Sequence, residues 1–198
     1  MTVFLVDDHE MMQLGLKTWI ETHTDFKVCG TAGNSKSAME YISVNQPDIL
    51  IVDIDLGEES GFDLVKTALS KNPELKVLMY SMHNESGYIF DAQRCGAKGY
   101  ITKASVSDEF GVALKEIAAG NTYFSNKFLK NNGAFEEAIK FLTPKEAQVF
   151  TSILKKLDNN QIAKELNISL HSVEIYVSRI YAKLGIHYRD ELIERFEV

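Results

Sequence analysis

The stretch TVFLVDD, residues 2–8, begins as an apolar run and ends in two adjacent aspartates. A run of this kind predicts a short strand over residues 2–6 that is covered on both faces, as in a parallel sheet. Asp7 and Asp8 then stand at the carboxyl end of that strand, where each carboxylate raises the energetic cost of ionising the other. Two such groups side by side therefore indicate a polar site at this end of the sheet.

Four further short apolar runs follow, and amphipathic stretches separate them. The runs are FKVCGTA (26–32), DILIVD (48–53), KVLMY (76–80) and GYI (99–101). Buried strands that alternate with helices predict parallel strands joined by right-handed crossovers. We therefore predict an α/β domain with a five-stranded, parallel, doubly wound sheet.

After about residue 120 the pattern changes to helices alone. Thr143 with Glu146 has the spacing of a capping box, in which the N-cap and N3 side chains each bond the other's backbone. A second capping box, formed by Asp158 and Gln161, predicts the start of another helix. A third helix is predicted to begin after Ser169 as its N-cap and to end at Gly185, and a last helix spans residues 189–196.

Composition narrows the class of protein. The chain has 198 residues, 45% of them hydrophobic, and a formal net charge of −7, which fits one or two globular domains. No stretch approaches the roughly 20 apolar residues of a membrane span. The first residues lack the basic lead of a signal peptide, so we expect a cytoplasmic protein. Cys29 and Cys95 lie far apart and are expected to be reduced packing residues.

Reactive side chains stand at the expected carboxyl ends of four strands. In chain order they are Asp7 and Asp8, Asp53, Ser81 and Lys103. Ligands of open α/β sheets bind beyond these ends. Three converging carboxylates call for a cation such as Mg²⁺. A carboxylate can also act as a nucleophile and form an aspartyl-phosphate, whose oxygens a hydroxyl and a lysine would bind. Each residue alone has an ordinary structural reading, such as helix cap or surface lysine, and only the joint pattern indicates a site.

Four motifs in this segment resemble the receiver domains of bacterial two-component response regulators. They are LVDDH (5–9), LIVDIDLGEESG (50–61), LMYSMH (78–83) and GAKGYITK (96–103). The resemblance covers residues 1–119 and implies a flavodoxin-like fold. It also implies the following roles: phosphorylation of Asp53 by a sensor histidine kinase; Mg²⁺ binding by Asp7, Asp8, Asp53 and the backbone carbonyl of Asp55; phosphoryl binding by Ser81 and Lys103; and reorientation of Tyr100 with Ser81.

Two positions depart from that family, which often has proline where Gly57 and Ala104 stand. Neither change removes a reactive group, so we expect altered loop geometry rather than lost function. Asp55 and His83 flank the expected pocket. They are either solvent-exposed loop residues or residues that tune the lifetime of the phosphoryl group.

ILIVDIDLG, residues 49–57, also resembles the first motif of haloacid-dehalogenase-type phosphatases, with Asp53 as nucleophile and Asp55 as general acid. The order of the motifs opposes this alternative, because that family's acidic pair comes last. No segment predicts the cap domain of such an enzyme. The match is therefore a remote alternative.

Residues 142–186 resemble the LuxR/NarL-type helix-turn-helix domain without a gap, through LTPKE, NNQIAKELNIS and KLGI. That family packs four helices and places the third in the DNA major groove as a dimer. The chain thus divides into a receiver (1–119), a linker (120–137) and an all-α helix-turn-helix domain (138–198).

The third helix of this domain has two faces. Its apolar stripe consists of Val173, Tyr176, Val177, Ile180, Tyr181 and Leu184. The outward residues, which we predict to contact DNA, are Glu174, Ile175, Ser178, Arg179, Ala182 and Lys183. Glu174 suits a cytosine amino group, Ile175 and Ala182 suit a thymine methyl, and Arg179 and Lys183 suit phosphates.

Charge opposes a simple DNA-binding prediction. Residues 135–198 hold nine basic against ten acidic residues, whereas DNA-binding domains usually carry a basic patch. The family commonly has lysine where Glu174 stands and histidine where Tyr176 stands. Two hypotheses therefore remain: a homodimeric response regulator that binds double-stranded promoter DNA, or a receiver-controlled protein-interaction module. Neither is an enzyme, beyond phosphoryl acceptance and slow autodephosphorylation.

Overall fold

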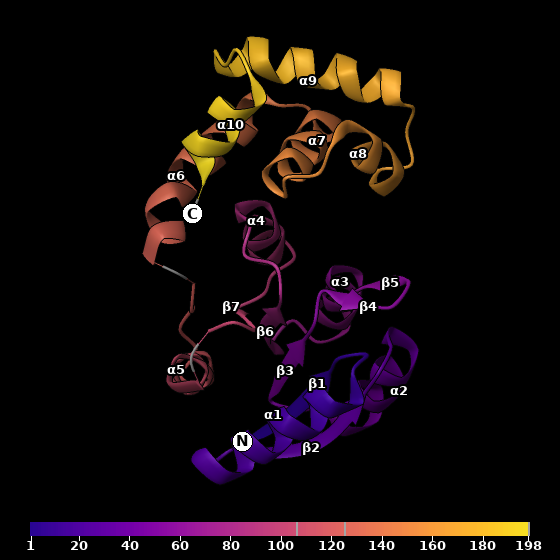
Figure 1. Ribbon diagram of the computed structural model, residues 1–198. Coiled ribbons are helices and arrows are strands. Elements are labelled where there is room, and N and C mark those ends of the chain that lie inside the picture. The colour runs from indigo at the N-terminus through magenta and orange to yellow at the C-terminus, as the bar shows by residue number, and fades with distance from the viewer. Residues whose placement is uncertain (106, 125, 198) are drawn as a thin grey trace. The chain divides into compact units, whose positions relative to one another are not determined.

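The computed structural model (Figure 1) describes residues 1–105, 107–124 and 126–197. Their contacts divide the chain into two compact units. The first comprises Met1–His83 and Ala92–Phe124, and the second comprises Asn84–Asp91 and Ser125–Val198.

The first unit contains the predicted parallel sheet. Its strands are β1 (Thr2–Val6), β2 (Lys27–Ala32), β3 (Ile49–Val52), β6 (Lys76–Ser81) and β7 (Gly99–Thr102), in the order β2-β1-β3-β6-β7. Each neighbouring pair is parallel. The prediction of a five-stranded parallel sheet is confirmed.

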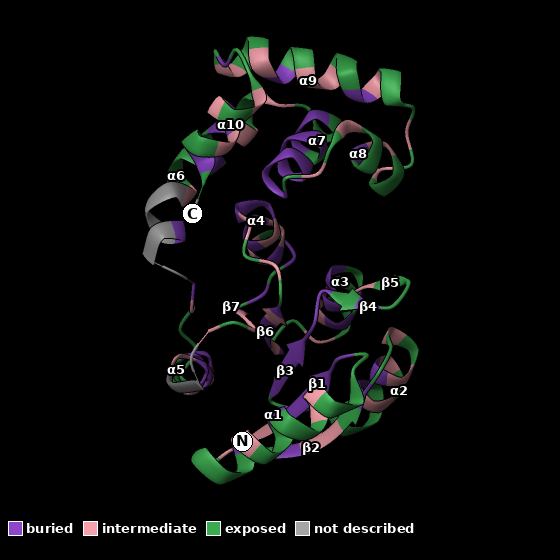
Figure 2. Cartoon of the chain, in the orientation of Figure 1, coloured by how far each residue is buried: buried purple, intermediate pink, exposed green. Residues whose placement is uncertain are grey.

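Helices alternate with these strands along the chain. They are α1 (Glu10–His23), α2 (Ser35–Asn45), α3 (Gly61–Lys71), α4 (Ser86–Arg94) and α5 (Ser107–Ala118). Leu5 of β1 packs in one apolar cluster with Ile20 of α1 and Leu114 of α5. Phe4, the residue before Leu5, points to the opposite face and stacks on Tyr41 of α2, with ring centroids 4.3 Å apart. Helices therefore cover both faces, which is why Val3–Val6 of β1 and all four residues of β3 are apolar and buried (Figure 2).

A two-stranded hairpin follows β3 and was not predicted. Its strands, β4 (Asp55–Leu56) and β5 (Glu59–Ser60), are antiparallel. Gly57 in its turn has a φ of +70°. Proline is restricted to φ near −65°, so a proline at position 57 could not adopt this turn conformation. The altered loop geometry expected at Gly57 and Ala104 stays a prediction.

The hairpin returns the chain to within contact of Asp53. Gly61 starts α3, and its N–H donates to the carbonyl of Ile54 at 2.8 Å. A Cβ atom on Gly61 would lie 2.0 Å from the carbonyl oxygen of Asp53. Only glycine permits this approach, which fixes the backbone that carries Asp53.

The second unit is helical apart from its loops. Besides Asn84–Asp91 it contains α6 (Asn126–Phe141), α7 (Pro144–Leu154), α8 (Asn159–Glu165), α9 (Leu170–Leu184) and α10 (Arg189–Phe196). Both predicted capping boxes are present, Ser169 caps α9, and Gly185 ends it with a φ of +65°. Helix α6 was not predicted and occupies much of the proposed linker, 120–137.

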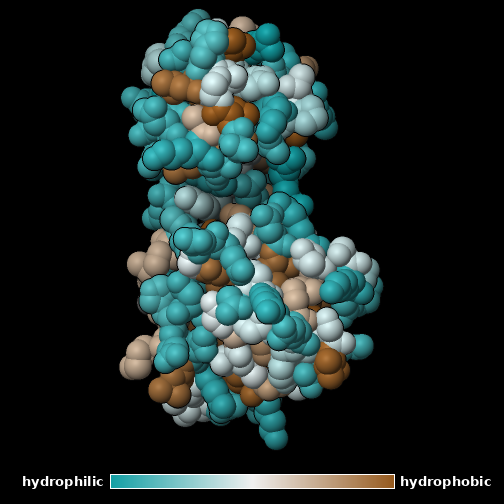
Figure 3. Space-filling view, turned by 90° about the vertical axis from the view of Figure 1, so that its right-hand side faces the viewer, coloured by the Kyte–Doolittle hydropathy of each residue, from teal (hydrophilic) through white to brown (hydrophobic). Residues whose placement is uncertain are grey.

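The surface shown in Figure 3 is mainly hydrophilic, and its hydrophobic residues lie in small separate groups. Among the described residues, every helix is too short or too polar to span a bilayer.

Gly61 permits a direct test of this backbone geometry. Gly61→Ala should lower the free energy of unfolding of the first unit by about 2 kcal/mol, because the added methyl group meets backbone rather than a flexible side chain. Urea unfolding followed by the fluorescence of Trp19, the single tryptophan, measures this. The control is Gly15→Ala in α1, where nothing lies within 4 Å and the same change should stabilise by about 0.5–1 kcal/mol. Equal stability of the two variants would contradict the proposed constraint.

Candidate functional site

Lys103 joins the carboxylates at the carboxyl ends of β1 and β3. Its Nζ donates to Asp7 Oδ2 and to Asp53 Oδ2, each at 2.6 Å. The three side chains are only 4–6% exposed. They are distant in sequence, yet the parallel order of the strands brings them to one edge of the sheet. Three of the predicted site residues therefore meet.

Asp8 and His9 complete the acidic side of the cluster. His9 Nδ1 lies 2.7 Å from Asp8 Oδ1 and 3.3 Å from Asp7 Oδ1, and the His9 N–H donates to Asp7 Oδ1 at 2.9 Å. One potential ligand atom from each of Asp7, Asp8, His9 and Asp53 lies within 4.8 Å of the others. His9 lies within the LVDDH motif, but no role is predicted for it from the sequence. The feature that could have indicated a role for His9 is its position directly before α1, next to the two aspartates.

Burial governs the electrostatics of the cluster. Removal from water raises the pKa of Asp53, and the Lys103 ammonium offsets this only in part. Burial alone would lower the pKa of Lys103, but its bonds to Asp53 and Asp7 outweigh that effect and raise it. Among the described residues, Asp53 Oδ1 is buried with no hydrogen-bond partner. The cluster thus has one cation for several carboxylates and an oxygen that still needs a partner.

Ser81, Asp55 and His83 line the neighbouring strand ends. Ser81 is fully buried, and its Oγ accepts a bond of 3.4 Å from the His83 N–H. His83 Nε2 lies 3.0 Å from Asp55 Oδ2. Asp55 is exposed and His83 half-buried, so this pair stands at the surface next to the buried cluster. Phosphoryl binding by Ser81 and metal binding by the Asp55 carbonyl stay predictions.

Tyr100 lies in β7 with its ring buried. Its hydroxyl donates to the backbone carbonyl of His83 at 2.8 Å. Tyr100 therefore holds the loop that leads from Ser81 into α4. Its predicted reorientation stays a prediction.

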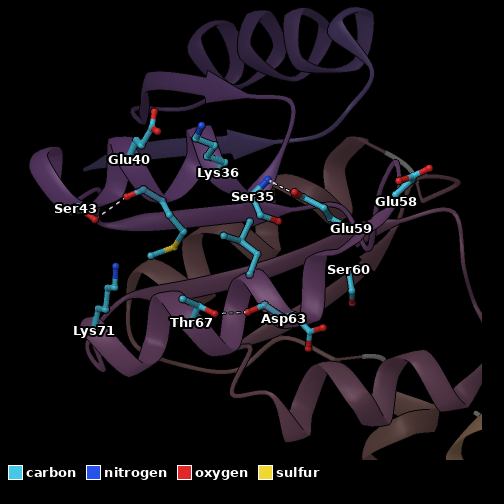
Figure 4. Close-up of a pocket in the computed structure, with 12 residues that line it drawn as sticks. Ser35, Lys36, Glu40, Ser43, Glu58, Glu59, Ser60, Asp63, Thr67 and Lys71 are labelled. Atoms are coloured by element: carbon cyan, nitrogen blue, oxygen red, sulfur yellow. Dashed lines mark hydrogen bonds between the residues drawn. The ribbon is translucent and has the colours of Figure 1, made fainter. Parts of the chain in front are cut away.

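A hollow of about 730 Å³ lies elsewhere in the first unit, along α2, α3 and the β4–β5 hairpin (Figure 4). None of its lining residues belongs to the carboxylate cluster. Lysines and acidic residues both line it, including Lys36, Lys71, Glu40 and Asp63. Because both positive and negative side chains line the hollow, its charge favours neither an anionic nor a cationic ligand. We assign the hollow no function.

Helix α9 has the two faces predicted from its sequence. Every residue of the apolar stripe is buried or half-buried, and every predicted DNA contact is exposed (Figure 2). Lys183 is nevertheless engaged within the protein, because its Nζ donates to Glu146 Oε2 at 2.6 Å. Burial alone would raise the pKa of Glu146, but its bonds to Lys183 and Thr143 lower it. The DNA contacts stay predictions.

The buried cation can be tested by its removal. Lys103→Met should lower the free energy of unfolding of the first unit by about 3 kcal/mol at neutral pH, since it leaves buried carboxylates uncompensated. The loss should shrink as the pH falls through the raised pKa of Asp53, because a protonated carboxyl needs no cation. Urea unfolding at several pH values measures this. Lys66→Met, which removes an exposed partner of Asp63, is the control and should change little. A loss independent of pH would contradict this account.

Comparison with known proteins places both segments in families. Residues 3–115 match the response regulator receiver domain, and residues 140–196 match the luxR family of bacterial regulatory proteins. The DNA-binding transcriptional activator DevR/DosR of Mycobacterium tuberculosis is 32% identical over 196 residues, which cover 96% of this chain and 90% of that protein.

Solved structures share the fold. A LuxR-family two-component response regulator from Aurantimonas sp. SI85-9A1 is 27% identical with a TM-score of 0.62, over 65% of this chain and 92% of that one. RcsB from Salmonella enterica serovar Typhimurium, bound to promoter rprA in the presence of phosphomimetic BeF3−, is 21% identical with a TM-score of 0.65, over 99% and 98%. The chain belongs to the two-component response regulators of the LuxR family, with a receiver domain and a helix-turn-helix DNA-binding domain.

Proposed function

We propose that Asp53 is the phosphoacceptor of this response regulator and that a sensor histidine kinase is the donor. The observation that supports this most is the buried, unpartnered Oδ1 of Asp53 beside the Lys103 ammonium. A carboxylate oxygen of Asp53 attacks the phosphorus of a phosphohistidine. The phosphorus–nitrogen bond breaks, and the imidazole nitrogen leaves with the bonding electron pair. The other members of the cluster position and neutralise this centre.

The donor set fits Mg²⁺, a hard ion that takes one or two carboxylates together with phosphate oxygens. Asp7, Asp8, Asp53 and the backbone carbonyl of Asp55 would hold it. When bound, Mg²⁺ neutralises the charge that develops on the transferred phosphoryl group. Lys103 moves its hydrogen bond from Asp53 Oδ2 to a phosphoryl oxygen, and the Ser81 hydroxyl donates to another.

Promoter DNA is the proposed target of the second unit. Support comes from the exposed outer face of α9 and from the relatives, one named as a DNA-binding activator and one solved on a promoter. We propose that a homodimer binds double-stranded DNA, because two copies of α9 double the few positive contacts.

One observation favours the alternative of a protein-interaction module. The ion pair between Lys183 and Glu146 removes a cation from a helix that has few. The phosphatase alternative has no such support, since both family matches belong to regulators. Slow autodephosphorylation, with Asp55 and His83 beside the attacking water, remains part of the proposal.

Asp53→Asn tests the phosphoacceptor. Acetyl phosphate with Mg²⁺ should add one phosphoryl group to the unmodified chain, detected by intact-protein mass spectrometry, and should promote dimerisation in analytical ultracentrifugation. Asp53→Asn should lose both responses, because an amide is not a nucleophile of this kind, and EDTA should suppress labelling. Asp63→Asn, an exposed aspartate of α3, should respond normally. Labelling that persists in Asp53→Asn would move the phosphoacceptor elsewhere.

Glu174→Ala tests the DNA-binding face. Selection of bound DNA with each variant should show weaker preference at one base pair, by about 1–3 kcal/mol, because a base contact is lost. Glu194→Ala removes the same charge from an exposed position on α10. It should change overall affinity without changing base preference. Identical preferences in both variants would eliminate the contact, and no binding by the phosphorylated unmodified chain would favour the protein-interaction alternative.

A further inference from the structure

A histidine stands on the open side of the carboxylate cluster. His9 lies between β1 and α1, and its side chain is 71% exposed, whereas those of Asp7 and Asp53 are buried. The His9 Nδ1 atom is 2.7 Å from Asp8 Oδ1 and 3.3 Å from Asp7 Oδ1. The cluster therefore offers one nitrogen donor beside its oxygens, at a position that an ion can reach from water.

Backbone hydrogen bonds hold His9 in this place. Its N–H donates to Asp7 Oδ1 at 2.9 Å, and its carbonyl accepts from the N–H groups of Met12 at 3.0 Å and Gln13 at 3.2 Å. The Gln13 side chain in turn donates to the carbonyl of Asp7 at 2.6 Å. The backbone of His9 is thus bound both to the end of β1 and to the first turn of α1.

Lys103 leaves the second oxygen of each buried carboxylate to other partners. Its Nζ binds the Oδ2 atoms of Asp7 and Asp53. Asp53 Oδ1 is buried and has no hydrogen-bond partner among the described residues, and Asp7 Oδ1 lies beside His9. The lysine and a bound ion can therefore use different oxygens of the same carboxylates.

The donor atoms have the spacing of ligands of a single ion. Ligand atoms at about 2.0–2.2 Å from a metal ion lie about 3 Å apart when they stand at a right angle. The nitrogen of His9 is at 2.7 Å and 3.3 Å from two carboxylate oxygens. One donor atom from each of four residues lies within 4.8 Å of the others: Asp7, Asp8, His9 and Asp53.

A nitrogen donor changes which ions such a site prefers. Mg²⁺ takes oxygen ligands, whereas the imidazole nitrogen favours divalent ions of the first transition series. We propose that His9 Nδ1 is a metal ligand and that the receiver binds a divalent transition-metal ion more tightly than Mg²⁺ because of it. Mg²⁺ still binds through the carboxylates, so phosphorylation of Asp53 can use either ion. This inference rests on the metal site of the proposed function and names its ion class.

His9→Ala tests the nitrogen donor, with Mn²⁺ as the probe. The full-length chain is titrated calorimetrically with Mn²⁺ or Mg²⁺ at about pH 7.5 without a phosphodonor. Carboxylates alone also bind Mn²⁺, so the decisive quantity is the part of its affinity that depends on His9. The substitution should weaken Mn²⁺ binding about tenfold and change Mg²⁺ binding less than about twofold, because the oxygen ligands remain.

Spectroscopy of the bound ion gives a second measurement. Electron spin-echo spectroscopy of the Mn²⁺-loaded chain should show coupling to the nucleus of a directly bound imidazole nitrogen. His9→Ala should lose this coupling. The readout depends on which atom binds the ion, so a change in folding stability alone would not produce the expected result.

Two further variants serve as controls. His171→Ala removes an exposed histidine of α9 whose Nδ1 lies 3.7 Å from Glu174 Oε2, and it should change neither affinity nor coupling. Asp8→Asn removes a carboxylate and keeps His9, so it should weaken binding of both ions.

The outcomes separate this inference from the proposed function. Equal Mn²⁺ affinities of His9→Ala and His171→Ala, or no nitrogen coupling in the unmodified chain, would overturn the role of His9. Labelling of Asp53 by acetyl phosphate with Mg²⁺ would leave the proposed function standing in that case. Failure of that labelling would instead refute the proposed function, and the nitrogen coupling would still decide whether His9 binds the ion.

Discussion

The Lys103 ammonium shared by two buried carboxylates is the interaction on which the first unit depends. Asp7 and Asp53 are nearly inaccessible to water, and the Lys103 ammonium that compensates their buried negative charge lies 2.6 Å from each. The three residues can meet only if β1, β3 and β7 are parallel and end at the same edge of one sheet. The balance remains incomplete, since one charge faces two and Asp53 Oδ1 has no partner among the described residues. The divalent cation and the phosphoryl group that we propose for this site would relieve that deficit.

Local features of the sequence predicted most of the fold. Apolar runs that end in polar residues identified the five strands and the edge where Asp7, Asp53 and Lys103 meet. This was possible because a few consecutive residues are enough to predict that a strand is buried and at which end its polar residues lie. Capping boxes located the starts of α7 and α8 for a similar reason, since the hydrogen bonds of each box join residues that lie within a stretch of four. Helix α6 escaped prediction. Its burial depends on distant partners such as Phe90, and periodicity shows which face is apolar without showing what covers it.

Ion pairs within the protein explain why the net charge of residues 135–198 does not show which basic side chains are available to contact DNA. Glu146 and Lys183 cancel in a sum of charges, but in space they form an ion pair that holds α9 to the start of α7. Lys155 is likewise committed to Asp91 and Glu165 inside the protein. Lys155 and Lys183 are thus paired with acidic residues of the protein, and so is Lys156, whose Nζ lies 3.3 Å from Glu197 Oε1. Affinity for DNA in such a unit would depend on base contacts and on two copies acting together more than on phosphate contacts.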